Sequence, residues 1–273
     1  MSGGIERVVV ALDAASETRN AIAVAARLAA RARARLHGIF IEDEDLLRLA
    51  QLPFARHVTL GAGAGPLSAG EIERQLRGAA ERVRREFAAA ARHNQIEWSF
   101  EIVRHAADAP LVTATQWDLV VAGPLARPIG RHFRTEWRWW SSVEQISGPL
   151  LLAQRDWSAS GPILAVIRDR DAGSARLLAM AARLAEAVGS ALVAVCPPQL
   201  AGEEGFAEWV AEQVEPYSVP LRIELAAADP AELDRRIAEL RCRVLAVHAG
   251  AGVPLDRLRA LFTRLACDIL VVH

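Results

Sequence analysis

Residues 8–29 read VVVALDAASETRNAIAVAARLA, and the end of this stretch returns later in the chain. AVAARLA at 23–29 is matched by AMAARLA at 179–185, an offset of 156 residues. The same offset aligns residues 8–13 with residues 164–169, and residues 36–40 with residues 192–196. A match that continues through an apolar run, a turn, a helical segment and a second apolar run indicates internal duplication.

Each half alternates apolar runs with segments of helical periodicity. Short, continuous apolar runs are typical of strands that are buried on both faces of a parallel sheet. The predicted strands are 8–12, 36–41, 97–103, 118–122 and 149–153, then 163–167, 191–195, 221–226, 244–247 and 269–272. The predicted helices are 18–35, 69–93 and 108–116, then 175–188, 231–240 and 255–265, with Gly189 ending the fourth of them. We expect a loop or lid at 51–70 and a shorter counterpart at 197–205.

Strands separated by helices imply right-handed βαβ units and a parallel sheet covered on both faces. The sequence therefore predicts an α/β protein of two tandem, doubly wound, five-stranded domains. We place them at 1–156 and 161–273, on either side of the polar stretch DWSASG.

Composition narrows the class of protein. Hydrophobic residues make up 52% of the chain, and 32 Lys+Arg against 33 Asp+Glu leave a net charge of −1. This balance favours a globular protein and argues against a nucleic-acid binder. We find no apolar stretch that could span a membrane and no signal peptide, so we expect a cytoplasmic protein with no membrane partner.

The reactive side chains form no catalytic or metal-binding motif. The seven histidines lack HExxH or Cys/His metal spacing, and no serine lies in a G-x-S-x-G context. Cys196, Cys242 and Cys267 are far apart in the sequence and lie in or beside apolar runs, which favours buried, inert thiols. We therefore expect no catalytic residue and no metal.

The tandem halves, the acidic residue after the first strand, TQWDLVVAG at 115–123 and GPLLLA at 148–153 resemble the universal stress protein family. The resemblance covers nearly the whole chain and is greatest in the first half. It implies Rossmann-like domains, similar to adenine-nucleotide α-hydrolases, and a role in stress response. Ligands of such folds bind beyond the carboxyl ends of the strands, where the strand order reverses.

Nucleotide-binding members of this family carry Gly, two residues, Gly, nine residues, Gly and then Ser or Thr. Glycines there let backbone N–H groups approach phosphates. The resemblance assigns a tentative site to Asp13, Gly123, Gly130, Ser141 and Ser142, and implies ATP or another adenine nucleotide. Asp13 could equally cap the turn that follows its strand.

This glycine pattern is degenerate in the present chain. Ala126 stands where the second glycine belongs, so Gly130 fits only after a four-residue insertion, and Trp140 replaces the third glycine. An indole there would fill the phosphate space, so we expect impaired ATP binding.

The second half departs further from the pattern. Its weak counterparts of the first-half site are Asp169, His248, Gly250 and Gly252, with no nine-residue spacer and no Gly-Ser. We expect Asp169 to cap a turn and the glycines to form one.

Trp137, Trp139 and Trp140 lie beside arginines and could stack bases. Because the total charge is balanced, we favour an interface between halves or subunits. The leading hypothesis is a tandem universal stress protein whose halves form an intramolecular pseudo-dimer through their last strands. Two such chains could also pair as a homodimer. The alternatives are a small-molecule or ATP binder with weak nucleotide hydrolysis, and a redox or flavin-type relative.

Overall fold

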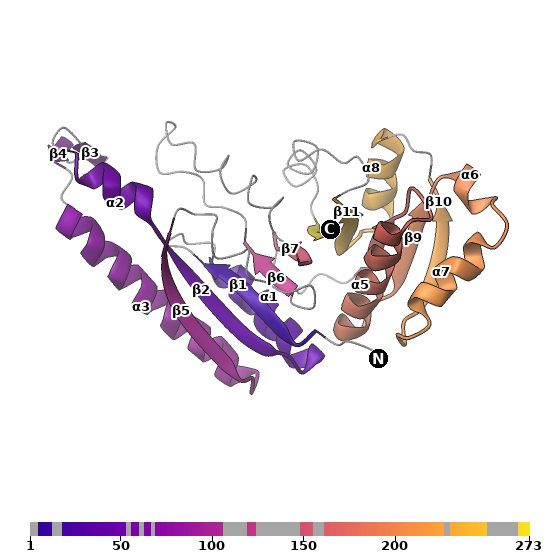
Figure 1. Cartoon of the computed structure of the whole chain (residues 1–273), viewed down its shortest axis with the longest axis horizontal. Helices are drawn as coiled ribbons and strands as arrows, with labels where there is room; N and C mark the ends of the chain where they lie inside the picture. Colours follow the sequence, from indigo (N-terminus) through magenta and orange to yellow (C-terminus); the bar gives the residue numbers. More distant parts are fainter. Residues whose placement is uncertain are drawn as a thin grey trace.

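A computed structural model describes residues 5–12, 18–52, 56–59, 63–66, 69–105, 119–123, 148–154, 161–226, 230–249 and 267–273. Ten strands form a single sheet in the order β10-β9-β8-β11-β12-β7-β6-β1-β2-β5 (Figure 1). All neighbouring strands of this sheet run parallel except β7 and β12, which are antiparallel. The sheet is therefore two doubly wound units of five strands each, joined at their last strands.

The first unit contains five strands of the large sheet. They are β1 (Arg7–Leu12), β2 (Arg35–Asp43), β5 (Trp98–His105), β6 (Leu119–Ala122) and β7 (Leu150–Leu152). Its helices are α1 (Thr18–Ala32), α2 (Glu44–Ala50) and α3 (Ala69–His93), and a hairpin of β3 (Arg56–Thr59) and β4 (Gly63–Pro66) stands apart.

The second unit repeats the strand order with β8 (Ile163–Val166), β9 (Leu192–Cys196), β10 (Leu221–Leu225), β11 (Val244–His248) and β12 (Asp268–Val272). Its helices are α5 (Ala172–Val188), α6 (Pro198–Ala201), α7 (Phe206–Val214) and α8 (Pro230–Glu239). The ten strands of the large sheet confirm the ten predicted from apolar runs.

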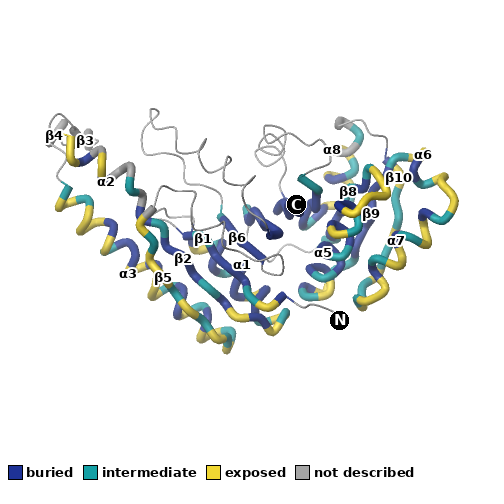
Figure 2. The backbone as a smooth tube through the Cα atoms, viewed as in Figure 1, coloured by how far each residue is buried: buried dark blue, intermediate teal, exposed yellow. Residues whose placement is uncertain are grey.

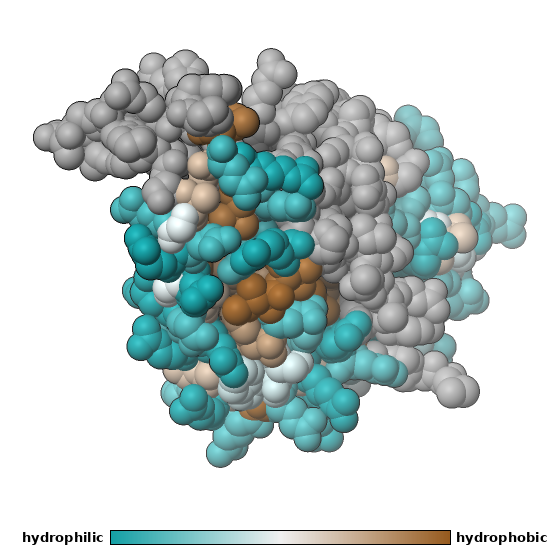
Figure 3. Space-filling model, turned by 60° about the vertical axis from the view of Figure 1, so that its left-hand side comes forward, coloured by the Kyte–Doolittle hydropathy of each residue, from teal (hydrophilic) through white to brown (hydrophobic). Residues whose placement is uncertain are grey.

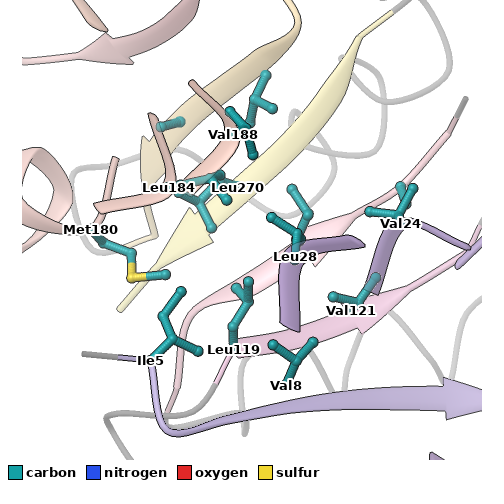
Figure 4. Close-up of a cluster of buried hydrophobic side chains, with 14 of the residues drawn as sticks. Ile5, Val8, Val24, Leu28, Leu119, Val121, Met180, Leu184, Val188 and Leu270 are labelled. Carbon is teal, nitrogen blue, oxygen red and sulfur yellow. The ribbon is translucent and has the colours of Figure 1, made fainter. Parts of the chain in front are cut away.

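The hydrophobic core continues across the junction between the units. Leu150, Leu151 and Leu152 of β7 pair with Val271, Leu270 and Ile269 of β12. On one face of the sheet, α1 and α5 pack against each other and share a buried cluster with the strands (Figure 4). The last strands thereby cover each other's hydrogen-bonding edge, which would otherwise be open to other chains.

The ends of two corresponding helices have the same backbone conformation. Gly189 follows α5 with φ +65°, and its N–H bonds to the carbonyls of Ala185 and Glu186. Arg33, 156 positions earlier, follows α1 with φ +54°. This left-handed conformation suits glycine and is uncommon for arginine. Gly189 was predicted as a helix end from the sequence, and the duplication extends to Arg33.

Several elements were missed in the sequence. Part of the segment 51–70, predicted as a loop, forms the β3–β4 hairpin, and 197–205 contains α6. Helices α2 and α7 were also not predicted. The predicted helices at 108–116 and 255–265 lie outside the residues that the structure describes.

The outer faces of the helices are exposed, while the central strands are buried (Figure 2). In Figure 3, hydrophobic residues gather near the middle of the face turned forward, with hydrophilic residues above them and to their left. Within the described ranges, no helix is both long enough and apolar enough to cross a membrane.

Candidate functional site

The strand order reverses once in each unit. In the first unit this point lies between β1 and β6, and in the second it lies between β8 and β11. Open α/β sheets bind their ligands beyond the carboxyl ends of the strands at such a point. Each unit therefore has one expected ligand position.

The first-unit position is described only in part. Gly123 directly follows β6 and is partly buried. The other predicted residues of this unit lie outside the described residues: Asp13, Gly130, Ser141, Ser142, Trp137, Trp139 and Trp140. Gly250 and Gly252 of the second unit lie outside them as well.

His248 occupies the second-unit position. It is the last residue of β11, as Gly123 is the first residue after β6. Its imidazole lies against Gly173 in the first turn of α5: a Cβ on Gly173 would be 2.1 Å from His248 Cε1 and 2.4 Å from Nε2. Atoms of real side chains essentially never approach this closely, so a larger residue at position 173 would displace the ring from where it lies.

Asp171 caps the start of α5. It is the N-cap residue, and its Oδ1 accepts a hydrogen bond of 2.7 Å from the backbone N–H of Ser174. This hydrogen bond, assisted by the charges of His248 and Arg176, holds the pKa of Asp171 below its ordinary value. Asp169, predicted to cap the turn after its strand, is exposed and lies two positions before this N-cap residue. The signal was present as Asp171 three residues before Ser174, a typical N-cap spacing.

A second histidine lies near His248. His273 follows β12, which pairs with β11, and Arg176 of α5 donates from Nε to the main-chain oxygen of His273 at 3.1 Å. Burial, with a smaller effect of His248, lowers the pKa of His273. The Nδ1 of His248 and the Nε2 of His273 are buried and have no hydrogen-bond partner among the residues that the structure describes. Burial of the His273 imidazole therefore favours its neutral form.

The cysteines are buried thiols, as predicted. Burial raises the pKa of Cys196. Cys242 and Cys267 are distant in the sequence, but their side chains are hydrogen-bonded, and this contact together with burial raises the pKa of Cys242. Thiols with raised pKa values are poor nucleophiles. In the described parts of the chain, no three His, Cys, Asp or Glu side chains are grouped to hold a metal ion.

Two further polar features lie away from the crevices. On β2 and β5, His37 Nδ1 is 2.7 Å from Ser99 Oγ, and His37 Nε2 is 3.2 Å from Glu101 Oε1. A pocket of about 410 Å³ lies at the amino ends of the same strands, between the last turns of α1 and α3. Sequence reasoning found neither feature, because both depend on the pairing of strands about 60 residues apart.

Comparison with known proteins identifies the fold. No protein-family model and no curated protein sequence matches the chain. Among solved structures, a universal stress protein from Archaeoglobus fulgidus DSM 4304 superposes with a TM-score of 0.69 and 10% identity, over 98% of this chain and 96% of that chain.

Two structures from Pseudomonas aeruginosa are also similar. A putative universal stress protein from strain UCBPP-PA14 gives a TM-score of 0.59 at 16% identity, over 98% of this chain and 93% of that chain. A functionally unknown protein from strain PAO1 gives a TM-score of 0.58 at 16% identity, over 98% of this chain and 92% of that chain. The chain therefore has the fold of the universal stress proteins over nearly its whole length.

Proposed function

We propose that this chain is a tandem universal stress protein that acts in a stress response by binding or protein interaction, without catalytic turnover. The observation that carries the proposal is the full-length similarity in fold to structures of about the same chain length. The two units, paired through β7 and β12, would act as an intramolecular pseudo-dimer in the cytoplasm.

Impaired ATP binding is part of the proposal. In the first unit, Trp140 stands at the third glycine of the phosphate frame. In the second unit, the residue at the end of β11 is His248, whose ring already contacts the start of α5. His248 puts a ring at the start of a helix, where a phosphate would need backbone N–H groups and free space, and by the family pattern an indole at position 140 would have the same effect.

A direct titration tests this part of the proposal. Isothermal titration of the full chain with Mg-ATP should give no measurable heat of binding, and a phosphate-release assay should stay at the rate of the buffer. Saturable heat with one site per chain would instead support the second candidate, an adenine-nucleotide binder that uses the first-unit crevice near Asp13 and Ser141. Release of phosphate above background would support weak hydrolysis.

Substitutions in the glycine pattern of the first unit test which residue impairs ATP binding. Trp140→Gly should increase ATP affinity if the indole fills the phosphate space. Trp137→Gly is the matched control, because it removes an indole from the same stretch but outside the glycine frame. Equal behaviour of the two variants would show that the insertion, and not Trp140, excludes the nucleotide.

The role in stress response needs a test in cells. A deletion strain should survive starvation or oxidant exposure less well than its parent, and expression of the full chain should restore survival. Unchanged survival under every stress applied would contradict this part of the proposal.

A further inference from the structure

The crevice of the second unit is occupied by a side chain of the protein itself. It lies between β8 and β11, where the strand order reverses and where open α/β sheets bind their ligands. His248 ends β11, and its ring reaches across to Gly173 in the first turn of α5. The imidazole therefore bridges the two sides of the crevice.

The contact between the two residues is tight. A Cβ added to Gly173 would meet three ring atoms of His248, Cε1 at 2.1 Å, Nε2 at 2.4 Å and Nδ1 at 2.7 Å. Gly173 is buried, and the Nδ1 of His248 has no contact with solvent. Glycine is a poor helix former compared with alanine, and its lack of a Cβ here leaves the space that the ring occupies.

Two N–H groups at the start of α5 already have acceptors within the protein. Asp171 accepts the N–H of Ser174 with its carboxylate and the N–H of Ala175 with its main-chain oxygen, at 3.0 Å. A carboxylate at this position supplies the negative charge that a helix N-terminus favours. Asp171 thus uses two N–H groups of the first turn of α5, and the ring of His248 fills the space beside Gly173 in the same turn.

We propose that His248, seated on Gly173, is a built-in plug that excludes phosphate-bearing ligands from the crevice of the second unit. The corresponding position of the first unit is Gly123, which has no side chain. The two units of the chain are therefore unequal, and His248 is the residue that determines ligand exclusion in the second. This inference rests on the geometry of the second unit and does not depend on whether the first unit binds ATP.

Removal of the ring tests the proposal. His248→Gly should raise the affinity of the full chain for Mg-ATP at least tenfold, with new protection from hydrogen exchange at the start of α5. His248→Phe keeps a ring of similar shape and should bind no better than the unmodified chain. The proposal is overturned if His248→Gly shows no gain in affinity, if the protection appears elsewhere, or if His248→Phe gains as much.

A second variant tests the contact without any ligand. Gly173→Ala would place a methyl group within the ring of His248, so the imidazole must leave the crevice. The exchange of the His248 Cε1–H, followed by mass spectrometry, should be slow in the unmodified chain and several-fold faster in Gly173→Ala. An unchanged exchange rate would contradict the proposed contact between His248 and Gly173. This result does not depend on the outcome of the nucleotide titration.

These outcomes are separate from those of the proposed function. A gain of affinity in Trp140→Gly concerns the first unit, whereas protection at the start of α5 concerns the second. If the unmodified chain binds ATP without protection at α5, the proposed impairment fails and the plug at His248 stands.

Discussion

The backbone N–H of Gln154 donates a hydrogen bond of 2.7 Å to Oδ1 of Asp268, across 114 positions of the chain. Gln154 follows β7 and Asp268 begins β12, so the bond lies at one end of the antiparallel junction. Asp268 is only 4% exposed. Its carboxylate therefore fixes the register in which the two units share one sheet.

Asp268→Ala should lower the free energy of unfolding by about 1–3 kcal/mol, because the N–H of Gln154 loses a buried acceptor. Asp268→Asn retains an oxygen acceptor and should cost less. Denaturant unfolding monitored by circular dichroism measures both variants. Equal stability of Asp268→Ala and the unmodified chain would show that the bond does not support the junction.

Gly38 in β2 is predicted to tolerate no larger residue. An added Cβ would be 2.8 Å from Cδ2 of Phe100 and 2.9 Å from Cε2 of Phe87, and these rings pack edge-on with centroids 5.6 Å apart. Gly38→Ala should therefore destabilise the chain by about 1–3 kcal/mol through overpacking. Gly70→Ala is the control, since nothing lies within 4 Å of its added Cβ. A thermal melt that ranks the two variants in the opposite order would contradict the packing described.

Arg33 and Gly189 offer a matched pair at the ends of α1 and α5. Both have a positive φ, +54° and +65°, which costs a non-glycine residue about 1 kcal/mol or more. Arg33→Gly should stabilise the chain by up to about 1 kcal/mol, and Gly189→Ala should destabilise it by a similar amount. Denaturant midpoints of both variants provide the measurement, and changes of the same sign would refute the shared conformation.

The cap of α5 should show in the pH dependence of stability. Because its pKa is lowered in the folded state, Asp171 stabilises the fold above its unfolded pKa of about 3.8, and this contribution is lost as the pH falls through the folded value. Asp171→Ala should cost about 1 kcal/mol at neutral pH. The difference between the unmodified chain and this variant should shrink below pH 4, and a constant difference down to pH 2 would contradict it.

The periodicity of the sequence was sufficient to predict the ten strands of the sheet and the bounds of α3, because burial on both faces leaves continuous apolar runs. It missed α2 and α6, which have seven and four residues, too few for a periodic pattern to stand out. The repeat of GAGAG at 61–65 suggested a loop, yet part of it pairs as β4 in a hairpin.

The candidate site was harder to predict from the sequence than the fold. His248 was identified by its position after an apolar run, but its contact with Gly173 joins residues 75 positions apart. Asp169 was identified because the repeat aligns it with Asp13, whereas Asp171, which caps α5, has no counterpart in that alignment and was missed. Long-range packing and the exact start of a helix are the features that a single sequence specifies least.

Mass spectrometry of the purified full chain tests the central claim most directly, that the protein acts by interaction and not through a bound nucleotide. Protein prepared without added nucleotide should have the mass of the unliganded chain, or of an oligomer of unliganded chains, under native conditions. Denaturation should then release no adenine nucleotide. Recovery of one or two adenine nucleotides per chain after denaturation would contradict the account.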